Sequence, residues 1–372
     1  MVRPNETEIV SERLAVSGVD AERRRGRGTV SNVSGRYEPI SRVTEDDGWG
    51  VLETLEAFKT DVTLEYPRTI ITRNDSPDIP FDRSLNPYRG CEHGCIYCFA
   101  RPTHAYMGLS PGLDFETKLF AKQNAAQLLE REFSARSYRP ALLAIGTNTD
   151  PYQPIERTRK IMRGVLDVLN RFNHPVGIVT KSALITRDID LLTPLAEKGL
   201  VKIYLSITSL DPHLSRIMEP RAATPSKRLA AVKQLNDAGI PTGVMVAPIL
   251  PAINDHEIER IVEASVECGA REANYILLRL PLEIKALYRE WLQVNFPGKL
   301  KHALSLIQQT RGGKDYNPRF GERLTGEGPY ATLIAQRFAL QVQKHGLNRE
   351  RKKARVNLFA VPPKVGDQMS LF

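Results

Sequence analysis

The amino-acid sequence predicts an α/β protein built as an open, partial (β/α)6 barrel, with extra C-terminal helices and flexible basic termini. Two observations lead to this fold class. Short apolar runs alternate with segments of about 10–15 residues whose apolar side chains recur at helical spacing. Five such strands, and a sixth expected just before a cysteine-rich loop, make six strand–helix units. Alternation of this kind favours a parallel sheet covered by helices.

Each expected strand is a run of mostly aliphatic residues that stops at a polar residue or a turn. The strands are expected at 69–72, 141–146, 176–180, 201–208, 243–250 and 274–280. Helices are expected at 115–134, 155–170, 186–198, 225–238 and 255–268. Three of these helices are followed by Gly199, Gly239 or Gly269, and glycine is the residue that most readily ends a helix.

The expected strand 201–208 alternates in a way that bears on function. Its odd-numbered residues are apolar, whereas Ser206 and Thr208 are polar. In a barrel whose outside is covered by helices, the apolar face lies outward, so Ser206 and Thr208 are expected to point into the cavity. Such side chains usually meet a ligand, although a small hydroxyl can also satisfy nearby backbone groups.

Composition limits where this chain works. No run approaches the roughly 20 apolar residues of a membrane span, and the N-terminus lacks the apolar core of a secretion signal. Of the four cysteines, three share one loop, which indicates a reducing compartment rather than a disulfide scaffold. We therefore expect a cytoplasmic protein without membrane contact.

The formal charge of +9 is concentrated near the two ends of the chain. Residues 21–36 hold five Arg and one Glu, and residues 344–372 hold seven Lys or Arg and two acidic residues. Basic arms commonly bind nucleic-acid phosphates, although many serve only solubility. Four regions are expected along the chain. They are a mostly disordered basic extension at 1–65, the barrel at 66–285, a C-terminal helical and loop extension at 286–345, and a basic tail at 346–372.

The cysteine loop is the most informative motif. Cys91, Cys95 and Cys98 follow the spacing C-x3-C-x2-C, and Gly90 and Gly94 allow the backbone to curl tightly around them. Iron–sulfur cubanes normally take four cysteine thiolates, so three would leave one iron for a ligand that is not protein. The alternative is a structural zinc whose fourth ligand is distant, such as Cys268 or His93.

Three cysteines at this spacing, with Tyr97 before the last, resemble the signature of the radical S-adenosylmethionine (SAM) superfamily. The resemblance implies a [4Fe–4S] cluster on Cys91, Cys95 and Cys98, with SAM chelated at the open iron. It also implies an external electron donor. One electron then cleaves SAM to methionine and a 5′-deoxyadenosyl radical, and the protein orients the reactants.

The run Asp150-Pro-Tyr-Gln-Pro-Ile-Glu156 narrows the resemblance to the spore photoproduct lyase-like (DNA repair photolyase-like) branch. In parallel barrels ligands bind where strands end, so the residues after each apolar run are the ones to compare. The resemblance implies SAM contacts at Asn148, Thr149, Asp150, Lys181, Ser206, Ala247, Tyr97 and Phe99. Among these, Lys181 would pair with the SAM carboxylate, and Tyr97 is also the candidate catalytic residue. A plain helix cap at Asp150 and an exposed lysine at 181 are the alternatives.

The chain departs from spore photoproduct lyase in its hydrogen donors. That enzyme splits a thymine dimer in DNA and uses a cysteine and tyrosines, but the matching stretch 147–150 holds no cysteine. Phe99 stands where the lyase has a tyrosine. We therefore expect a radical SAM enzyme of the lyase or oxidoreductase class that acts on nucleic acid in repair or modification, without true spore photoproduct lyase activity. The alternatives are a protein or small-molecule substrate, and a zinc-stabilised adaptor that is not an enzyme.

Two segments outside the barrel carry further expectations. The loop 311–330 is rich in Gly, Arg and aromatic residues, and could either stack bases or close the open side of the barrel. The last five residues resemble the peptide by which repair proteins bind the DNA sliding clamp. They are Gln368, Met369, Ser370, Leu371 and Phe372.

Overall fold

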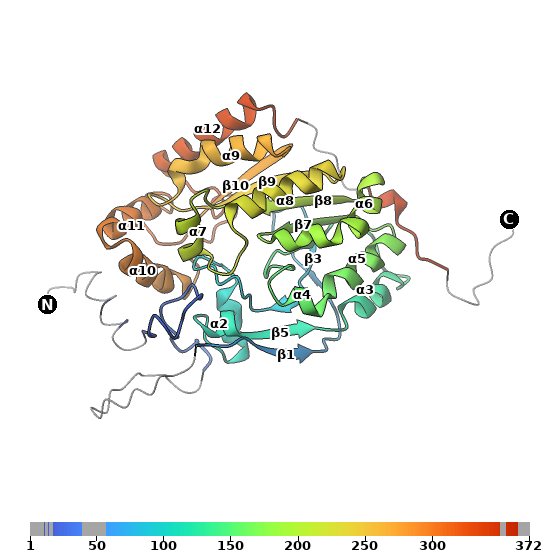
Figure 1. Ribbon diagram of the computed structural model, residues 1–372, viewed down its shortest axis with the longest axis horizontal. Coiled ribbons are helices and arrows are strands. Elements are labelled where there is room, and N and C mark those ends of the chain that lie inside the picture. Colours follow the sequence, from blue (N-terminus) through green and yellow to red (C-terminus); the bar gives the residue numbers. More distant parts are fainter. Residues whose placement is uncertain (1–10, 12–13, 15–17, 39–56, 350–354, 364–372) are drawn as a thin grey trace.

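The computed structural model describes residues 11, 14, 18–38, 57–349 and 355–363. Its centre is a seven-stranded sheet with helices along its outer face (Figure 1). In spatial order the strands are β10 (Glu272–Leu277), β9 (Thr242–Ile249), β8 (Val201–Ser206), β7 (Val176–Thr180), β6 (Leu143–Ile145), β3 (Arg83–Leu85) and β2 (Ile71–Arg73). All neighbours run parallel except β2 and β3. Within the described ranges, β2 and β10 are the two edges, so the six parallel strands form the expected open barrel.

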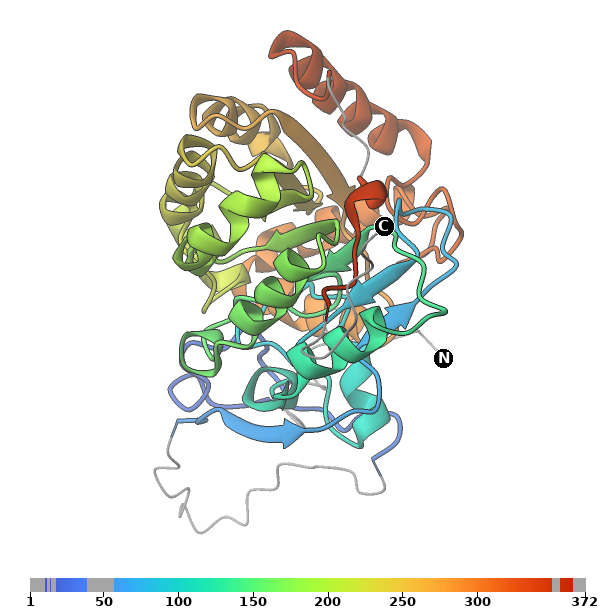
Figure 2. The same cartoon turned by 90° about the vertical axis from the view of Figure 1, so that its right-hand side faces the viewer.

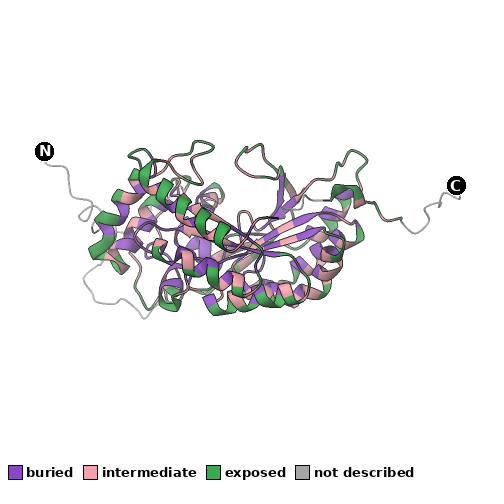
Figure 3. Ribbon diagram, turned by 90° about the horizontal axis from the view of Figure 1, so that it is seen from above, coloured by how far each residue is buried: buried purple, intermediate pink, exposed green. Residues whose placement is uncertain are grey.

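Helices follow the parallel strands and cover them from outside. They are α3 (Ala125–Phe133), α4 (Glu156–Arg159), α5 (Ile161–Arg171), α6 (Ile189–Glu197), α7 (Pro212–Met218), α8 (Pro225–Asp237) and α9 (Ile258–Glu267). Figure 3 shows buried residues along the strands and exposed residues on the outer helix faces. This is the amphipathic arrangement that the apolar spacing predicts.

The strand that leads into the cysteine loop is not the one expected. Residues 71–73 form β2, an antiparallel edge, whereas the sixth parallel strand is β3, which pairs with β6. The sequence of β3 is Arg83-Ser84-Leu85, with no apolar run to mark it. All three residues are buried, and Arg83 is neutralised by Asp82. Tertiary pairing therefore makes this strand, which local pattern could not show.

The helix expected at 115–134 is wrong in its first half. A short helix, α2 (Asp114–Thr117), is followed by strand β5 (Lys118–Lys122), and α3 forms the remainder. β5 lies between β1 (Asp61–Glu65) and β4 (Tyr88–Arg89) in a second, three-stranded sheet. Figures 1 and 2 show β1 on the opposite side of the molecule from α12 (Gly328–Lys344). Likewise, the expected helix 155–170 is divided at Lys160, whose φ is 52°.

The four expected regions and their boundaries stay predictions, but the N-terminal one contains ordered structure. Val30 is 4% exposed and Thr29 and Ser31 are fully buried, so residues 18–38 are not loosely draped. Arg27 is buried and donates to the carbonyls of Glu116 and Phe58. It is therefore not available to bind a phosphate group. Arg27 therefore interacts with the body of the protein, whereas phosphate binding by the other arginines of this region stays a prediction.

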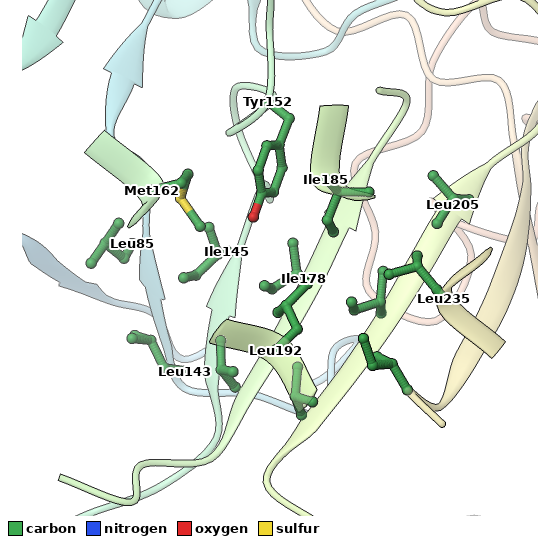
Figure 4. Packing of buried hydrophobic residues seen from close by; sticks show 14 of the residues in the cluster. Leu85, Leu143, Ile145, Tyr152, Met162, Ile178, Ile185, Leu192, Leu205 and Leu235 are labelled. Atoms are coloured by element: carbon green, nitrogen blue, oxygen red, sulfur yellow. The ribbon is translucent and has the colours of Figure 1, made fainter. Parts of the chain in front are cut away.

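Two hydrophobic clusters hold the barrel. The larger one fills the space between the sheet and its helices, and Figure 4 shows Leu143, Ile145 and Ile178 from the strands meeting Leu192 and Leu235 from the helices. The smaller one joins α10 (Ile284–Asn295) and α11 (Leu300–Gln309) to α7 and to the cysteine loop. The C-terminal helices therefore support the loop directly. No described helix is both long and apolar enough to cross a bilayer.

Burial of His174 gives a testable dependence of stability on pH. The ring stacks on Phe133 at 4.2 Å and bonds the Tyr138 hydroxyl at 2.7 Å, and burial lowers the pKa of His174 to about 3. As pH falls, His174 therefore binds a proton near pH 6.5 in the unfolded chain but only near pH 3 in the folded protein. The free energy of unfolding should therefore fall with decreasing pH between these values, by at most about 1.4 kcal/mol per pH unit. Urea denaturation across this range should show a shallower dependence for His174→Gln; equal slopes would contradict the prediction.

Candidate active site

The cysteine loop lies at the C-terminal end of β3, where its backbone is fixed by two left-handed glycines. Gly90 and Gly94 have φ values of 72° and 66°. A Cβ on Gly94 would lie 2.6 Å from the Glu116 carboxylate, so no other residue fits without a shift. The Cys91 amide donates to the Phe115 carbonyl at 2.9 Å. The loop is therefore held by its backbone, which leaves its thiols available.

The three thiols share one buried environment and form no disulfide. Cys91 and Cys95 are 5% and 7% exposed. Cys98 packs against the hydrophobic cluster that contains Cys95 and also against the one that contains Cys91. Burial raises the pKa of Cys91 and Cys95, and the Asp150 charge raises that of Cys91 further. Within the described ranges, no three His, Cys, Asp or Glu side chains are arranged to hold a single ion. The donor set fits a cluster in which three irons take one thiolate each.

Lys181 reaches the same loop from the end of β7. Its ammonium lies 5.7 Å from the centre of the Tyr97 ring. Its positive charge opposes the burial that raises the pKa of Cys95. Among the described residues, no carboxylate forms an ion pair with it. A cation beside the cysteine loop and without an acidic partner is suited to an anionic ligand group.

Tyr97 points into a buried polar network at the ends of β8 and α7. Its hydroxyl donates to Glu219 and lies 3.3 Å from the Thr208 hydroxyl. Glu219 also forms an ion pair with the fully buried Arg228, which donates to the Ser206 carbonyl at 3.0 Å. Burial raises the pKa of Glu219, and the Arg228 charge opposes this shift. The network fixes the Tyr97 ring and the Ser206 backbone, and Thr208 lies inside the barrel as its strand pattern predicts.

Asp150 links the ends of β6 and β7. It accepts hydrogen bonds from the Thr180 hydroxyl at 2.6 Å and the Lys181 amide at 2.7 Å, and from the Tyr152 amide at 2.9 Å. His93 lies 3.3 Å away. Burial alone would raise the pKa of Asp150, but His93 and these donors lower it to about 2. Asp150 is thus an ionised brace whose oxygens already have protein partners.

The remaining predicted contacts lie around these groups. The Asn148 amide donates to Asn86 at 3.0 Å, and the Thr149 hydroxyl donates to the Tyr88 carbonyl at 2.9 Å. Ala247 lies on β9, and its carbonyl is 3.4 Å from the Thr208 hydroxyl. The predicted residues therefore meet at one end of the sheet.

Phe99 departs from this group. Its side chain is 43% exposed and lies beneath Arg279, which follows β10. Tyr97 and Phe99 therefore direct their rings toward different strands, and the SAM contacts expected for both residues stay predictions.

The chain is similar to known proteins in sequence and fold. Residues 85–264 match the radical SAM superfamily. An uncharacterized protein of Mycobacterium tuberculosis is 37% identical over 260 residues, which is 69% of this chain and 75% of that protein. The chain belongs to the radical SAM superfamily. It is therefore an enzyme of a family whose cofactors are a [4Fe–4S] cluster and SAM.

Other similarities are more distant. An uncharacterized protein of Methanocaldococcus jannaschii is 26% identical over 214 residues, 57% of this chain and 76% of that protein. A solved spore photoproduct lyase with bound AdoMet and dinucleoside spore photoproduct matches at a TM-score of 0.56 and 14% identity. The match covers 76% of this chain and 79% of that one. This radical SAM protein has the same fold.

The cysteine loop of this radical SAM protein is held by a buried ion pair that sequence analysis missed. Arg101 and Glu116 are both fully buried, and their charged atoms lie 2.6 Å apart. Arg101 also donates to the carbonyls of Cys95 and Gly94 at 2.9 and 3.0 Å. Arg101 therefore connects the Glu116 carboxylate to the backbone that carries the second cysteine.

The N-terminal segment closes over the same carboxylate. Glu116 accepts from the Gly28 amide at 2.8 Å, and from the Thr29 amide and hydroxyl at 3.0 Å. Isolated in the sequence, a glutamate and an arginine look like surface residues. The sequence does not show that these groups are in contact, because 88 residues separate Gly28 from Glu116.

Residues 311–327, here called the cross-gap loop, extend between the two edges of the open sheet. Arg311 is buried and donates to the Leu278 carbonyl just after β10. At the other edge, Arg323 pairs with Asp78 in the β2–β3 connection, and the Gly321 amide donates to the same carboxylate at 2.6 Å. Of the two roles considered for this loop, the contacts favour closing the open side.

Proposed function

We propose that Cys91, Cys95 and Cys98 bind the [4Fe–4S] cluster and that this enzyme acts on nucleic acid in repair or modification. The supporting observation is the position of the cysteine loop, at the ends of the parallel strands and beside the Lys181 ammonium, which has no acidic partner among the described residues. When bound, the reduced cluster supplies the electron that cleaves SAM to methionine and a 5′-deoxyadenosyl radical.

The side chains around the loop would orient SAM. The Lys181 ammonium would pair with its carboxylate, and Ser206 would contact the ribose. Asp150 would act near the amino group, partly by holding the Lys181 backbone in place. The remaining proposed contacts are Asn148, Thr149, Ala247, Tyr97 and the Phe99 backbone. Glu219 and Arg228 would serve as positioning residues, since they hold Tyr97 and Ser206.

A nucleic-acid substrate is supported by the fold shared with spore photoproduct lyase and by arginines at the end of β10. The chain is nevertheless not proposed to be that lyase. Segment 147–150 lacks a cysteine, and Phe99 has no hydroxyl hydrogen to donate. A protein or small-molecule substrate is the alternative, whereas membership in an enzyme family leaves a zinc adaptor unsupported. Binding of the C-terminal peptide 368–372 to a sliding clamp stays a prediction, because it lies outside the described residues.

The direct experiment is anaerobic. Reconstituted, dithionite-reduced enzyme is incubated with SAM and a panel of damaged or modified DNA, and 5′-deoxyadenosine is quantified by chromatography. Release above the DNA-free rate on at least one DNA supports the proposal. Release that is unchanged by every DNA but stimulated by peptides would move the proposal to a protein substrate.

Lys181→Met should weaken SAM binding about tenfold or more, because a hydrogen bond to a charged group contributes about 1.5–3 kcal/mol. The measurement is equilibrium dialysis of radiolabelled SAM with the reconstituted protein. Lys227→Met, which removes an exposed lysine on α8, is the matched control. Equal affinities for the two variants would contradict the proposed role of Lys181.

A further inference from the structure

Phe99 is an exposed aromatic ring in an otherwise buried stretch. It follows the third cysteine and is 43% exposed, whereas Ala100 and Arg101 after it are fully buried. Packing within the protein does not explain why this apolar ring is exposed. The ring is therefore available to a ligand at the mouth of the barrel.

Arg279 covers one side of this ring. Its guanidinium carbon lies 4.9 Å from the ring centre, and it follows β10 at the same end of the sheet as the cysteine loop. Its Nε is buried without a hydrogen-bond partner, and its Nη2 is 3.4 Å from the Tyr316 hydroxyl. Arg279 therefore retains donor capacity that the described protein groups do not use.

The charges around Arg279 do not cancel it. Arg311 and Arg323 lie in the adjacent cross-gap loop. Asp78, whose carboxylate feels the charge of Arg279, is already engaged by Arg323 and by the Gly321 amide. Burial lowers the pKa of Arg311 to about 10, and the charge of Arg279 contributes to this shift. The mouth therefore carries an excess of positive charge beside an aromatic face.

The Phe99 ring points away from the side chains proposed to contact SAM, so that only the Phe99 backbone is shared with those contacts. The Tyr97 ring lies against Lys181 and Glu219, at the ends of β7 and β8, whereas the Phe99 ring lies against Arg279, at the end of β10. Strand β9 lies between β8 and β10 in the sheet. The cysteine loop thus presents the Tyr97 ring toward the ends of β7 and β8 and the Phe99 ring toward the end of β10.

We propose that the Phe99 ring and the Arg279 guanidinium form a platform for single-stranded nucleic acid, on which one base stacks while Arg279 binds the adjoining phosphate. Aromatic rings and arginine planes are the groups that hold unstacked bases, and stacking accepts any base. The pairing of an exposed ring with a cation matches a planar, anionic ligand. This inference rests on the proposed nucleic-acid function and names the surface that recognises its substrate.

The test measures anisotropy of a short fluorescein-labelled oligothymidine with anaerobically reconstituted holoenzyme at several salt concentrations. Phe99→Leu should weaken binding about fivefold or more, the loss expected for one stacked base. Arg279→Gln should weaken binding and reduce the salt dependence by about 0.7 in the log–log slope, as expected for one phosphate contact on a single strand. Phe99→Tyr keeps the ring and should bind within about twofold of wild type.

Arg136→Gln is the matched control for charge. Arg136 is exposed in the connection that enters β6, at the opposite end of the strands, and its loss should leave affinity within about twofold of wild type. Iron content and circular dichroism of each variant report folding independently of binding.

Three outcomes would overturn the platform. They are wild-type affinity in both Phe99→Leu and Arg279→Gln, a loss in Arg136→Gln as large as in Arg279→Gln, and a loss of SAM binding instead of oligonucleotide binding in Phe99→Leu. The last would assign the ring to the SAM adenine. The proposed function is tested separately, because it fails if the wild-type protein releases no 5′-deoxyadenosine in any condition.

Discussion

Cys95→Ala is expected to reduce bound iron and abolish release of 5′-deoxyadenosine, the largest change in activity for any single substitution in this chain. The remaining two thiols cannot hold three irons of a cubane, and the buried loop offers no described replacement ligand. The measurements are iron per protein after anaerobic reconstitution, the low-temperature electron paramagnetic resonance signal after reduction, and 5′-deoxyadenosine by chromatography.

Cys268→Ala provides the matched control. Cys268 follows α9, is half-buried against the large hydrophobic cluster and lies outside the cysteine loop. Its variant should keep the iron content and the activity of the wild type. Retention of both properties by Cys95→Ala, or their loss in Cys268→Ala, would refute the assignment of the cluster to Cys91, Cys95 and Cys98.

Arg101→Met should cause the largest loss of stability. The substitution leaves the fully buried Glu116 carboxylate without its cation and frees the Cys95 carbonyl. Removing one partner of a buried ion pair costs about 3–5 kcal/mol. Denaturant titration of the apoprotein should show this loss, and the reconstituted variant should release its iron faster in air because the loop is less constrained.

Lys233→Met tests whether any lost ion pair would have this effect. Lys233 pairs with Asp237 at 3.0 Å on the surface of α8, and both side chains are more than 60% exposed. Such a pair contributes about 0.5 kcal/mol or less. A similar loss of stability in the two variants would show that Arg101 has no special structural role.

Most of the barrel could be predicted because its strands carry apolar side chains that pack against the covering helices. Val176–Thr180 is mostly aliphatic and Val201–Ser206 alternates apolar with polar residues, and they form β7 and β8 within the expected ranges. The short β3 contains Arg83 and Ser84, so its burial depends on partners such as Asp82 that a pattern of apolar residues does not reveal. Long-range pairing likewise made a strand of residues 118–122, whose apolar spacing also suits a helix.

Some residues of the candidate site could be predicted from the sequence, whereas others could not. Lys181 could be found because it directly follows an apolar strand, and strand ends are where ligands bind in this fold. Glu219 and Arg228 could not, because their ion pair joins a helix end to the next helix and each residue alone resembles a solvated charge. The different directions of the Tyr97 and Phe99 rings also depend on which strands surround the loop. Such tertiary contacts cannot be predicted from local sequence.

Under the proposed nucleic-acid function, the cross-gap loop would limit how a polymeric substrate approaches the cysteine loop. It joins the β10 edge to the β2–β3 connection through Arg311 and Arg323, so a continuous strand cannot be laid sideways through the opening while these contacts persist. A target inside a duplex would have to be presented end-on, by swinging a single nucleotide out of its stack. Lesions and mismatches that already weaken stacking would then be the easiest targets to capture.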